Sequence, residues 1–144
     1  MKIREAKQKD AKIIEQILKS NALPSEDFEA HLNNFYLYED KNKIVGLAGY
    51  ELCGSYALLR SFAVLDEYKG LGLARKLYEA LKNKAKKEEI NSFYLLTETA
   101  SKYFEKLGFE YLDREKAPLS IENTEQFKSI CPNSAQLMYL DLLR

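Results

Sequence analysis

Residues 68–77 read YKGLGLARKL and form the most informative stretch of the sequence. Gly70, Gly72 and Ala74 are small and alternate with leucines, and basic side chains flank them on both sides. The strongly apolar segment 57–65 precedes the stretch, and a long charged segment with regularly spaced leucines follows it. This order predicts a buried central strand, then a glycine-rich turn, then an amphipathic helix.

A helix that begins directly after two glycines is a candidate binding site for an anion. The N–H groups of a first helical turn lack partners within the helix and carry a partial positive charge. Glycine lets a phosphate group approach these N–H groups, because no Cβ stands in the way. Lys69, Arg75 and Lys76 add full positive charges close by. Short glycine motifs are weak signals, so a plain tight turn into a helix remains the alternative.

Strands and helices alternate along the rest of the chain, which predicts an α/β or α+β domain. The pattern of apolar residues predicts strands at residues 1–5, 34–39, 44–52, 57–65, 91–97, 109–113 and 135–142. It predicts helices at residues 10–20, 25–31, 71–88, 99–107 and 118–130, with Asp10, Ser25 and Thr99 as caps of the first, second and fourth. The third helix is expected to bury Leu73, Leu77, Tyr78 and Leu81 on one face.

The composition indicates a globular domain without a general affinity for polyanions. The 144 residues suit a single domain, 1–144, with 46% hydrophobic and 31% charged residues. Lys plus Arg and Asp plus Glu each number 22, so the net charge of zero argues against nucleic acid as a partner. A membrane partner is not expected either, because no apolar run could span a bilayer and residues 1–10 lack the apolar core of a signal peptide.

Cysteine and histidine usage points to a cytoplasmic protein without a metal. The two cysteines, Cys53 and Cys131, fit a reducing compartment, although a disulfide between them stays open at this stage. A single histidine and the lack of a CxxC motif argue against a zinc site, and no metal is expected. Neither cysteine belongs to a visible Cys–His–acid pattern, so a cysteine nucleophile is not expected.

The stretch from Lys69 to Ala74 resembles the Arg/Gln-x-x-Gly-x-Gly/Ala motif of the GNAT acetyltransferases. Lys69 stands at the first position and keeps a positive charge there, and Ala74 is allowed at the last. The preceding residues 61–64, SFAV, resemble the strand that leads into this loop in the family. The beginning of the chain, with Arg4 and Asp10, also resembles the usual opening of the family.

Further segments carry the same resemblance. The family pattern N-x-x-A-x-x-x-Y-x-x-x-G-F is matched, with two departures, by Thr97, Ala100, Phe104, Gly108 and Phe109. Thr97 replaces the asparagine and Phe104 replaces the tyrosine. More narrowly, ALLRSFAV (57–64), FYLLTETA (93–100) and CPNSAQLM (131–138) resemble the acetyltransferases found with arsenic-resistance operons and, distantly, the acetyltransferase domain of N-acetylglutamate synthases.

The resemblance covers nearly the whole chain and implies the GNAT fold. This fold is a central mixed, mostly antiparallel sheet of six to seven strands, flanked by about four helices, with a splayed central strand pair. The family transfers an acetyl group from acetyl-CoA to a primary amine, and direct attack in a ternary complex is expected here. The implied partners are acetyl-CoA as donor and a small-molecule amine as acceptor, an amino acid or an amino-acid-like compound. A homodimer is a further expectation by analogy.

The resemblance assigns the cofactor to one strand end and one loop. The backbone of Phe62, Ala63 and Val64 would hold the pantetheine arm and polarise the thioester carbonyl. The N–H groups that would bind the pyrophosphate, with the nearby side chain of Arg75, belong to Lys69, Gly70, Leu71, Gly72, Leu73 and Ala74. Phe104 occupies the position of a tyrosine that often lies near the leaving sulfur in the family. Tyr103 is expected to face elsewhere, because one residue turns a helix by about 100°.

Glu51 and Glu98 are the candidate general bases, because each closes a predicted strand where the splayed pair opens. A carboxylate there could accept the proton of the amine through a water molecule. A solvated charge at a strand end is the alternative for each. His31, the lone histidine, is a third candidate base, but it better fits a position at the surface or at a helix end.

Candidate contacts to the acceptor come from charged and hydroxyl side chains. Arg60 lies within an apolar strand, where an unpaired charge is costly. It either holds the carboxylate of an amino-acid substrate or pairs internally with Glu51 or Glu98. Thr97 and Thr99 offer hydroxyl groups to the substrate, with a strand edge and a helix cap as the alternatives. Segments 23–32 and 134–138 are expected to shape the pocket.

Two other functions remain open at this stage. Phe104 in place of the tyrosine also fits an acyl-CoA-binding pseudoenzyme or sensor that does not turn over. The acceptor could instead be a polyamine, an aminoglycoside or a protein amine, which a wide acidic cleft would favour. Arg60 in the cleft would favour an anionic acceptor.

Overall fold

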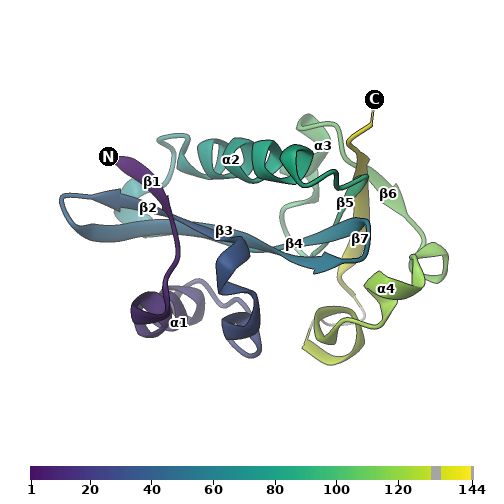
Figure 1. Ribbon diagram of the computed structural model, residues 1–144, viewed down its shortest axis with the longest axis horizontal. Coiled ribbons are helices and arrows are strands. Elements are labelled where there is room, and N and C mark those ends of the chain that lie inside the picture. Colours follow the sequence, from purple (N-terminus) through teal and green to yellow (C-terminus); the bar gives the residue numbers. More distant parts are fainter. Residues whose placement is uncertain (131–133, 144) are drawn as a thin grey trace.

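A seven-stranded sheet runs through the middle of the molecule (Figure 1). The computed structural model describes residues 1–130 and 134–143. The strands are β1 (Lys2–Glu5), β2 (Phe35–Asp40), β3 (Lys43–Cys53), β4 (Tyr56–Val64), β5 (Ser92–Thr97), β6 (Glu110–Leu112) and β7 (Gln136–Asp141). Their order across the sheet is β1-β2-β3-β4-β5-β7-β6, and β4 with β5 is a parallel pair while the other pairs of described strands are antiparallel. The expected mixed, mostly antiparallel sheet is confirmed.

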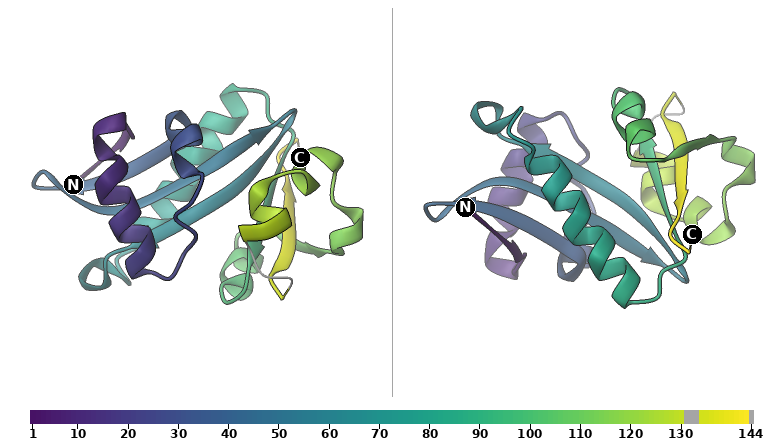
Figure 2. Two further views of the ribbon diagram at one scale, coloured as in Figure 1. Left: turned by 90° about the horizontal axis from the view of Figure 1, so that it is seen from below. Right: turned by 90° about the horizontal axis from the view of Figure 1, so that it is seen from above.

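Helices cover both faces of this sheet (Figure 2). The α-helices are α1 (Ala11–Ser20), α2 (Leu73–Lys87), α3 (Ser101–Lys106) and α4 (Leu119–Glu122), and a 3-10 segment spans Phe28–Asn34. In Figure 2, α2 crosses one face of the sheet, while α1 and the 3-10 segment lie on the opposite face. The inner face of α2 is the predicted one, since Leu73, Leu77, Tyr78 and Leu81 are all buried. The expectation of helices flanking a central sheet is confirmed.

Strands β4 and β5 diverge soon after they begin to pair. Their parallel register joins Tyr56 to Ser92, Ala57 to Phe93 and Leu58 to Tyr94, whereas β4 continues to Val64. On its other side, β4 carries a bulge against β3, because Arg60 pairs with Gly49 but Ala63 pairs with Leu47. Ser61, inside the bulge, has a positive φ of 65°. A bulge bends a strand and changes the direction of its backbone. Because β5 pairs only with the first residues of β4, the expected splayed strand pair is confirmed. The end of β4 borders the gap between the two strands.

None of the three expected helix caps is made as predicted. Asp10 does directly precede α1, but its carboxylate accepts the N–H of Lys7 at 2.8 Å and adds no cap bond to α1. The same carboxylate is paired with Arg4, and this pair ties β1 to the start of α1. The segment expected as a helix from Ser25 begins as 3-10 turns at Phe28 instead.

Thr99 is not the cap of α3, as had been expected. The helix begins at Ser101, and Thr97 provides the hydroxyl oxygen that accepts the N–H of Ala100 at 2.9 Å. Thr97 can do this because it is the last residue of β5, where the chain already turns toward the helix. The side chain of Thr97 therefore holds the turn that leads into α3, and the N-cap residue, Ala100, adds no side-chain cap bond.

The helix expected at residues 118–130 is broken into two pieces. α4 ends at Glu122, and a short π-helical turn covers Gln126–Ile130. Thr124 explains the break, because its hydroxyl donates to the carbonyl of Ile121 at 2.8 Å and accepts the N–H of Phe127 at 3.2 Å. Threonine commonly competes in this way for backbone groups that a continuous helix would use.

Two further expectations concern the chain as a whole. No helix of residues 1–130 or 134–143 has the length and apolar character needed to cross a bilayer. Cys131 lies outside the described residues, and the disulfide considered for it is therefore not addressed by the structure.

Candidate functional site

A cavity of about 760 Å³ opens beside the diverging ends of β4 and β5. Its walls come from these two strands, the glycine-rich loop, the first turn of α2, α3 and residues 21–24. These segments are far apart in the sequence and meet because the sheet order brings β4 and β5 side by side. The cavity therefore joins the predicted anion site to the strand gap and to the segment that precedes the 3-10 turns.

The glycine-rich loop leads into α2 as predicted. Gly72 immediately precedes the helix with a φ of 81°, and Gly70 has a φ of 80°. Residues with a side chain rarely adopt this left-handed conformation, so both positions favour glycine. A Cβ at either position would meet no heavy atom within 4 Å, which leaves open space before the backbone. An anion can therefore approach the N–H groups at the start of a helix of 15 residues.

Most residues expected to hold the cofactor line this cavity. They are Phe62, Val64, Lys69, Gly70, Gly72, Leu73, Ala74, Arg75 and Phe104. Ala63 and Leu71 are not among the lining residues. Ala63 is 3% exposed because it points to the opposite face of the sheet, toward the core under α1, whereas Leu71 is 57% exposed to solvent. The roles expected of these two residues involve only their backbone.

Basic side chains near the loop already have acidic partners. Nζ of Lys69 lies 2.9 Å from Oδ1 of Asp66, and Nε of Arg75 lies 3.1 Å from Oε1 of Glu79. These pairs are exposed, so each contributes little to stability and can rearrange toward a bound anion.

Phe104 and Tyr103 both face the cavity, which corrects the expectation that Tyr103 points elsewhere. The ring of Phe104 meets the ring of Phe62 edge to face, with centroids 5.6 Å apart. Tyr103 packs against Phe104 at 5.3 Å and is 37% exposed. Burial raises the pKa of Tyr103. The cavity thus has a phenol hydroxyl on its wall, from the residue next to the expected position.

Arg60 lines the cavity, yet its side chain is only 1% exposed and its guanidinium is engaged on several sides. Its Nη1 donates to Asp27 Oδ1 at 2.9 Å and to Glu51 Oε1 at 3.0 Å. Its Nη2 donates to the carbonyl oxygen of Glu26 at 3.3 Å, and its Nε donates to Ser61 Oγ at 3.1 Å. The internal ion pair considered for Arg60 is therefore present with Glu51, and Arg60 is also one of the residues that line the cavity.

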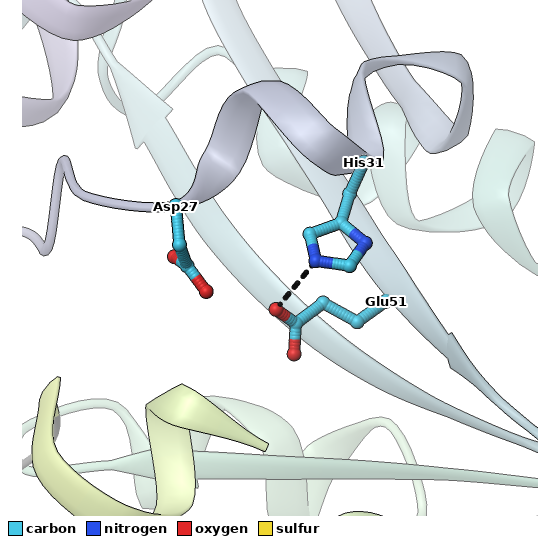
Figure 3. A group of neighbouring side chains, drawn as sticks. All are labelled: Asp27, His31 and Glu51. Carbon is cyan, nitrogen blue, oxygen red and sulfur yellow. Dashed lines mark ion pairs between the residues drawn. The ribbon is translucent and has the colours of Figure 1, made fainter.

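Glu51 is a buried, ionised partner of Arg60 and does not line the cavity. Its Oε1 also lies 3.0 Å from Nε2 of His31, and Figure 3 shows the imidazole directed at the carboxylate. Burial opposes ionisation of Glu51, but the His31 hydrogen bond and the Arg60 charge outweigh it, so the pKa of Glu51 is lowered. His31, expected at the surface, is thus 29% exposed and bound to the core.

Asp27 is the second carboxylate of this group. It belongs to the segment before the 3-10 turns, and its side chain is 24% exposed. Burial raises the pKa of Asp27, and the charge of Arg60 offsets only part of this effect. The two carboxylates that share Arg60 therefore differ. The lowered pKa of Glu51 means that the folded protein stabilises its charged form. The raised pKa of Asp27 means that its charged form is less favourable in the folded protein than in water.

Asp27, His31 and Glu51 also bring one potential metal-ligand atom each within 4.8 Å of one another. These are oxygen and nitrogen donors that several divalent metals accept. Arg60 Nη1, however, lies against both carboxylates, so the positive charge that a cation would supply is already present. The arrangement fits a guanidinium better than a metal ion.

Glu98, Thr97 and Thr99 all line the cavity, at the end of β5. Glu98 is exposed, and its Oε1 accepts a hydrogen bond from Ser134 Oγ at 3.1 Å. Of the two candidate bases, Glu98 is therefore the one that borders the cavity. The pair considered between Arg60 and Glu98 is replaced by the pair with Glu51.

Sequence reasoning missed Asp27 and the inward direction of Tyr103. Asp27 meets Arg60 from 33 positions away in the chain, and no local pattern marks such a contact. The signal that pointed in its direction was Arg60 itself, since a charge in an apolar strand requires partners. Tyr103 was missed because α3 spans only Ser101–Lys106, too short for its faces to be assigned by periodicity.

The splayed pair β4–β5 and the glycine-rich loop beside one cavity are the features expected of an acetyltransferase, and comparison with known families agrees. The family model described as "Acetyltransferase (GNAT) domain" matches residues 31–111, which is more than half of the chain. The chain therefore belongs to the GNAT acetyltransferase family. It is also 28% identical over 99 residues to the uncharacterized N-acetyltransferase CT2212 of Chlorobaculum tepidum. That match covers 67% of this chain and 62% of the relative, so less than two thirds of the relative is represented.

Solved structures share the fold. The N-acetylglutamate synthase of Neisseria gonorrhoeae, complexed with coenzyme A and N-acetyl-glutamate, gives a TM-score of 0.84 at 18% identity. The match covers 99% of this chain and 35% of that chain, so this chain spans about a third of the synthase. A GNAT-family acetyltransferase of Staphylococcus aureus Mu50 gives a TM-score of 0.76 at 21% identity, with 98% of both chains covered. At these identities the likeness concerns the fold alone.

Proposed function

We propose that the protein transfers the acetyl group of acetyl-CoA to the amino group of a small molecule, an amino acid or a close analogue. The observation that carries the proposal is the continuous cavity that joins the glycine-rich loop, the splayed end of β4 and Arg60. Acetyl-CoA needs a site for its phosphates, which the glycine-rich loop offers, and a site for its pantetheine arm, which the end of β4 offers. The acceptor must reach the thioester in the same space, and Arg60 lies there to bind it. Membership of the GNAT family supports the same conclusion.

The proposed cofactor contacts are mostly backbone contacts. The N–H groups from Lys69 to Ala74 hold the pyrophosphate, because two left-handed glycines keep that backbone open. The pantetheine arm lies along residues 62–64 of β4, where the strand has lost its partner β5. Arg75 contributes a charge near the phosphates, and Phe104 closes the apolar side of the arm.

The proposed chemistry is a direct attack in a ternary complex. Glu98 is the favoured base, because it borders the cavity and can accept the ammonium proton directly or through a water molecule. The free amine then attacks the thioester carbonyl, and the N–H groups of the β4 bulge stabilise the oxyanion that develops. Tyr103 keeps its proton at neutral pH and can donate it to the sulfur of CoA as the C–S bond of the tetrahedral intermediate breaks, and the phenolate then takes up the second proton of the attacking nitrogen. Glu51 remains the alternative base.

The proposed acceptor site lies at the Arg60 end of the cavity. Arg60 offers guanidinium donors for a carboxylate, and Thr97 and Thr99 offer hydroxyl groups beside it. The same proposal includes kinship with the arsenic-operon enzymes, which rests on the sequence segments described above. It also includes a cytoplasmic location, which rests on cysteine usage, and a homodimer, which rests on analogy with the fold.

Isothermal calorimetry with acetyl-CoA tests the donor site. We expect binding by the wild-type protein and a loss of at least about tenfold in affinity for Gly72→Glu, because bulk and negative charge enter the phosphate space. Gly54→Glu is the matched control, since Gly54 also has a positive φ, 65°, and open space, but lies in the turn between β3 and β4. No binding by the folded wild-type protein would overturn the proposal.

Release of free CoA thiol tests turnover. The panel consists of the proteinogenic L-amino acids, spermidine, an aminoglycoside and a peptide with a free N-terminus. Acetylation of one or more amino acids supports the proposal, and exclusive use of a cationic amine contradicts the acceptor class. Binding of acetyl-CoA without thiol release from any amine favours the second candidate, an acyl-CoA sensor, for which Phe104 in place of the family tyrosine is the motivating observation.

A further inference from the structure

The contacts of Arg60 include an unusual pair of oxygens from one short segment. Asp27 Oδ1 lies 2.9 Å from Nη1, and the carbonyl oxygen of Glu26 lies 3.3 Å from Nη2. A carboxylate that binds arginine in a bidentate manner places its two oxygens on two adjacent guanidinium nitrogens in the same way. Consecutive residues of this chain therefore imitate a bound carboxylate on Arg60.

We propose that residues 21–27 form a latch, whose Glu26 and Asp27 oxygens occupy the place of the acceptor's carboxylate on Arg60, and that the acceptor binds by displacing them. This inference rests on the proposed function and deepens it. It names a carboxylate-bearing amine as the acceptor class and adds a competitor that is part of the chain itself. The latch is autoinhibitory, because the guanidinium is available to the acceptor only when the latch is released.

Asp27, and not Glu51, is the exchangeable carboxylate of the pair on Nη1. Glu51 is fixed on β3, is 3% exposed and has a second hydrogen bond from His31. Asp27 sits in a loop, and its side chain retains 24% exposure. Burial also raises the pKa of Asp27, so its charged form gains by returning to water. Release of Asp27 therefore costs less than release of Glu51.

Backbone strain in the latch favours its release as well. Ala22 and Asp27 have φ values of 56° and 59°, although neither is glycine. A left-handed φ is unfavourable for a residue with a Cβ, and more so for alanine than for aspartate. The closed latch holds both, and an opened loop can relax them. The contacts with Arg60 thus work against stored strain.

The position of the latch places the exchange at the reaction site. Residues 21–24 line the same cavity as Arg60 and Thr97, so movement of the latch would widen the cavity where the acceptor enters. The charge balance is also kept, because an incoming carboxylate replaces the carboxylate of Asp27 beside Arg60. A cationic acceptor would be attracted by Asp27 rather than obstructed by it. Loss of the Asp27 carboxylate would therefore weaken the binding of a cationic acceptor instead of strengthening it.

Calorimetric titration of the CoA-bound protein with L-amino acids and their α-amides tests the latch. Asp27→Asn should lower the dissociation constant of carboxylate-bearing ligands about fivefold, the effect of removing one partly exposed ion pair from a competing state. The α-amides should be unaffected. Glu26→Gln is the matched control, because it removes the same charge one residue away and keeps the carbonyl contact with Arg60.

Two further variants separate the latch from effects on folding. Asp27→Gly removes the carboxylate while suiting the left-handed φ of 59°, and it should strengthen ligand binding in the same direction. Glu26→Trp introduces the first tryptophan of a chain that has none, on an exposed position of the latch. Its fluorescence should change saturably with the amino acid and not with the α-amide.

The titrations of Asp27→Asn decide whether the latch exists, and they are independent of the test of the donor site with Gly72→Glu. An unchanged or higher dissociation constant in Asp27→Asn overturns the inference, as does binding of spermidine that weakens in this variant. Failure of every amino acid to bind either protein also overturns it. Acetyl-CoA binding that is lost in Gly72→Glu would still support the proposed donor site in each of these cases, so failure of the latch and failure of the donor site are distinguishable.

Discussion

Arg60 Nη1 and Glu51 Oε1 lie 3.0 Å apart, and their side chains are 1% and 4% exposed. This pair joins β3 to β4 at the point where β4 bulges, beside the cavity. A buried charge that loses its partner is left without compensation from solvent. The pair is therefore a structural support for the acceptor end of the cavity.

Glu51→Gln is expected to destabilise the protein by about 3 kcal/mol, because Arg60 would keep a buried charge with one partner fewer. Urea unfolding measures this change. Glu98→Gln is the comparison, since Glu98 is exposed and its loss should leave stability within about 0.5 kcal/mol of wild type. Equal stabilities of the two variants would contradict the anchoring role of Glu51.

Glu98→Gln should instead lower kcat by about a hundredfold or more, as expected for loss of a general base. The affinity for acetyl-CoA should not change, because the proposed phosphate and pantetheine contacts lie elsewhere. Steady-state kinetics with the best amine of the panel provide the measurement, and Glu110→Gln, at an exposed position of β6, is the control. Unchanged kcat in Glu98→Gln would show that Glu98 is not the base.

Thr97→Val is expected to destabilise the protein by about 1 kcal/mol, the usual net contribution of one hydrogen bond. The hydroxyl oxygen of Thr97 accepts the N–H of Ala100, and valine has the same shape without an acceptor. Thr99→Val, two residues away, should leave the unfolding midpoint unchanged. The reverse order of the two variants in chemical denaturation would contradict this role of Thr97.

Asp10 should make the stability of the protein dependent on pH in the acid range. Hydrogen bonds from Arg4 lower the pKa of Asp10 below its ordinary value of 3.8. A carboxylate with a lowered pKa in the folded state stabilises the protein above the ordinary value, and this contribution disappears as the pH falls through the lowered value. We expect Asp10→Asn to cost about 2 kcal/mol at pH 7 and progressively less below pH 3.8.

Urea midpoints of wild type and Asp10→Asn across this pH range measure the effect. Asp66→Asn is the control, because Asp66 is 94% exposed in its pair with Lys69 and should contribute little at any pH. A difference between wild type and Asp10→Asn that stays constant down to strongly acidic pH would show that the charge of Asp10 is not its source.

Gly49→Ala should destabilise the protein by about 2 kcal/mol, because the new Cβ would overlap the ring of Phe35 on the neighbouring strand. That ring is 1% exposed and packed against Phe28, so it has little room to move. Gly46→Ala, on the same strand, is the matched control, since its nearest neighbour would be 3.4 Å away. Thermal unfolding of the two variants compares them, and similar midpoints would refute the packing argument.

The sequence by itself determined the order of elements and the donor half of the site. Seven strands and the inner face of α2 follow from apolar periodicity, which is a local property of the chain. The glycine-rich loop before α2 could be predicted for the same reason, because positive φ at Gly70 and Gly72 and the start of a helix are local features. A resemblance carried by several spaced motifs added the family, and the match over residues 31–111 agrees with it.

Only the tertiary structure decided the surroundings of Arg60, where we propose that the acceptor binds. Arg60 needed partners, but its choice of Asp27 and Glu51 depends on contacts across 33 and 9 positions of the chain. The directions of His31 and Tyr103 likewise depend on short elements whose faces have no readable period. Side-chain partners across a sheet are fixed by the register and the bulge of the strands, and these are set by packing of the whole domain rather than by any local segment.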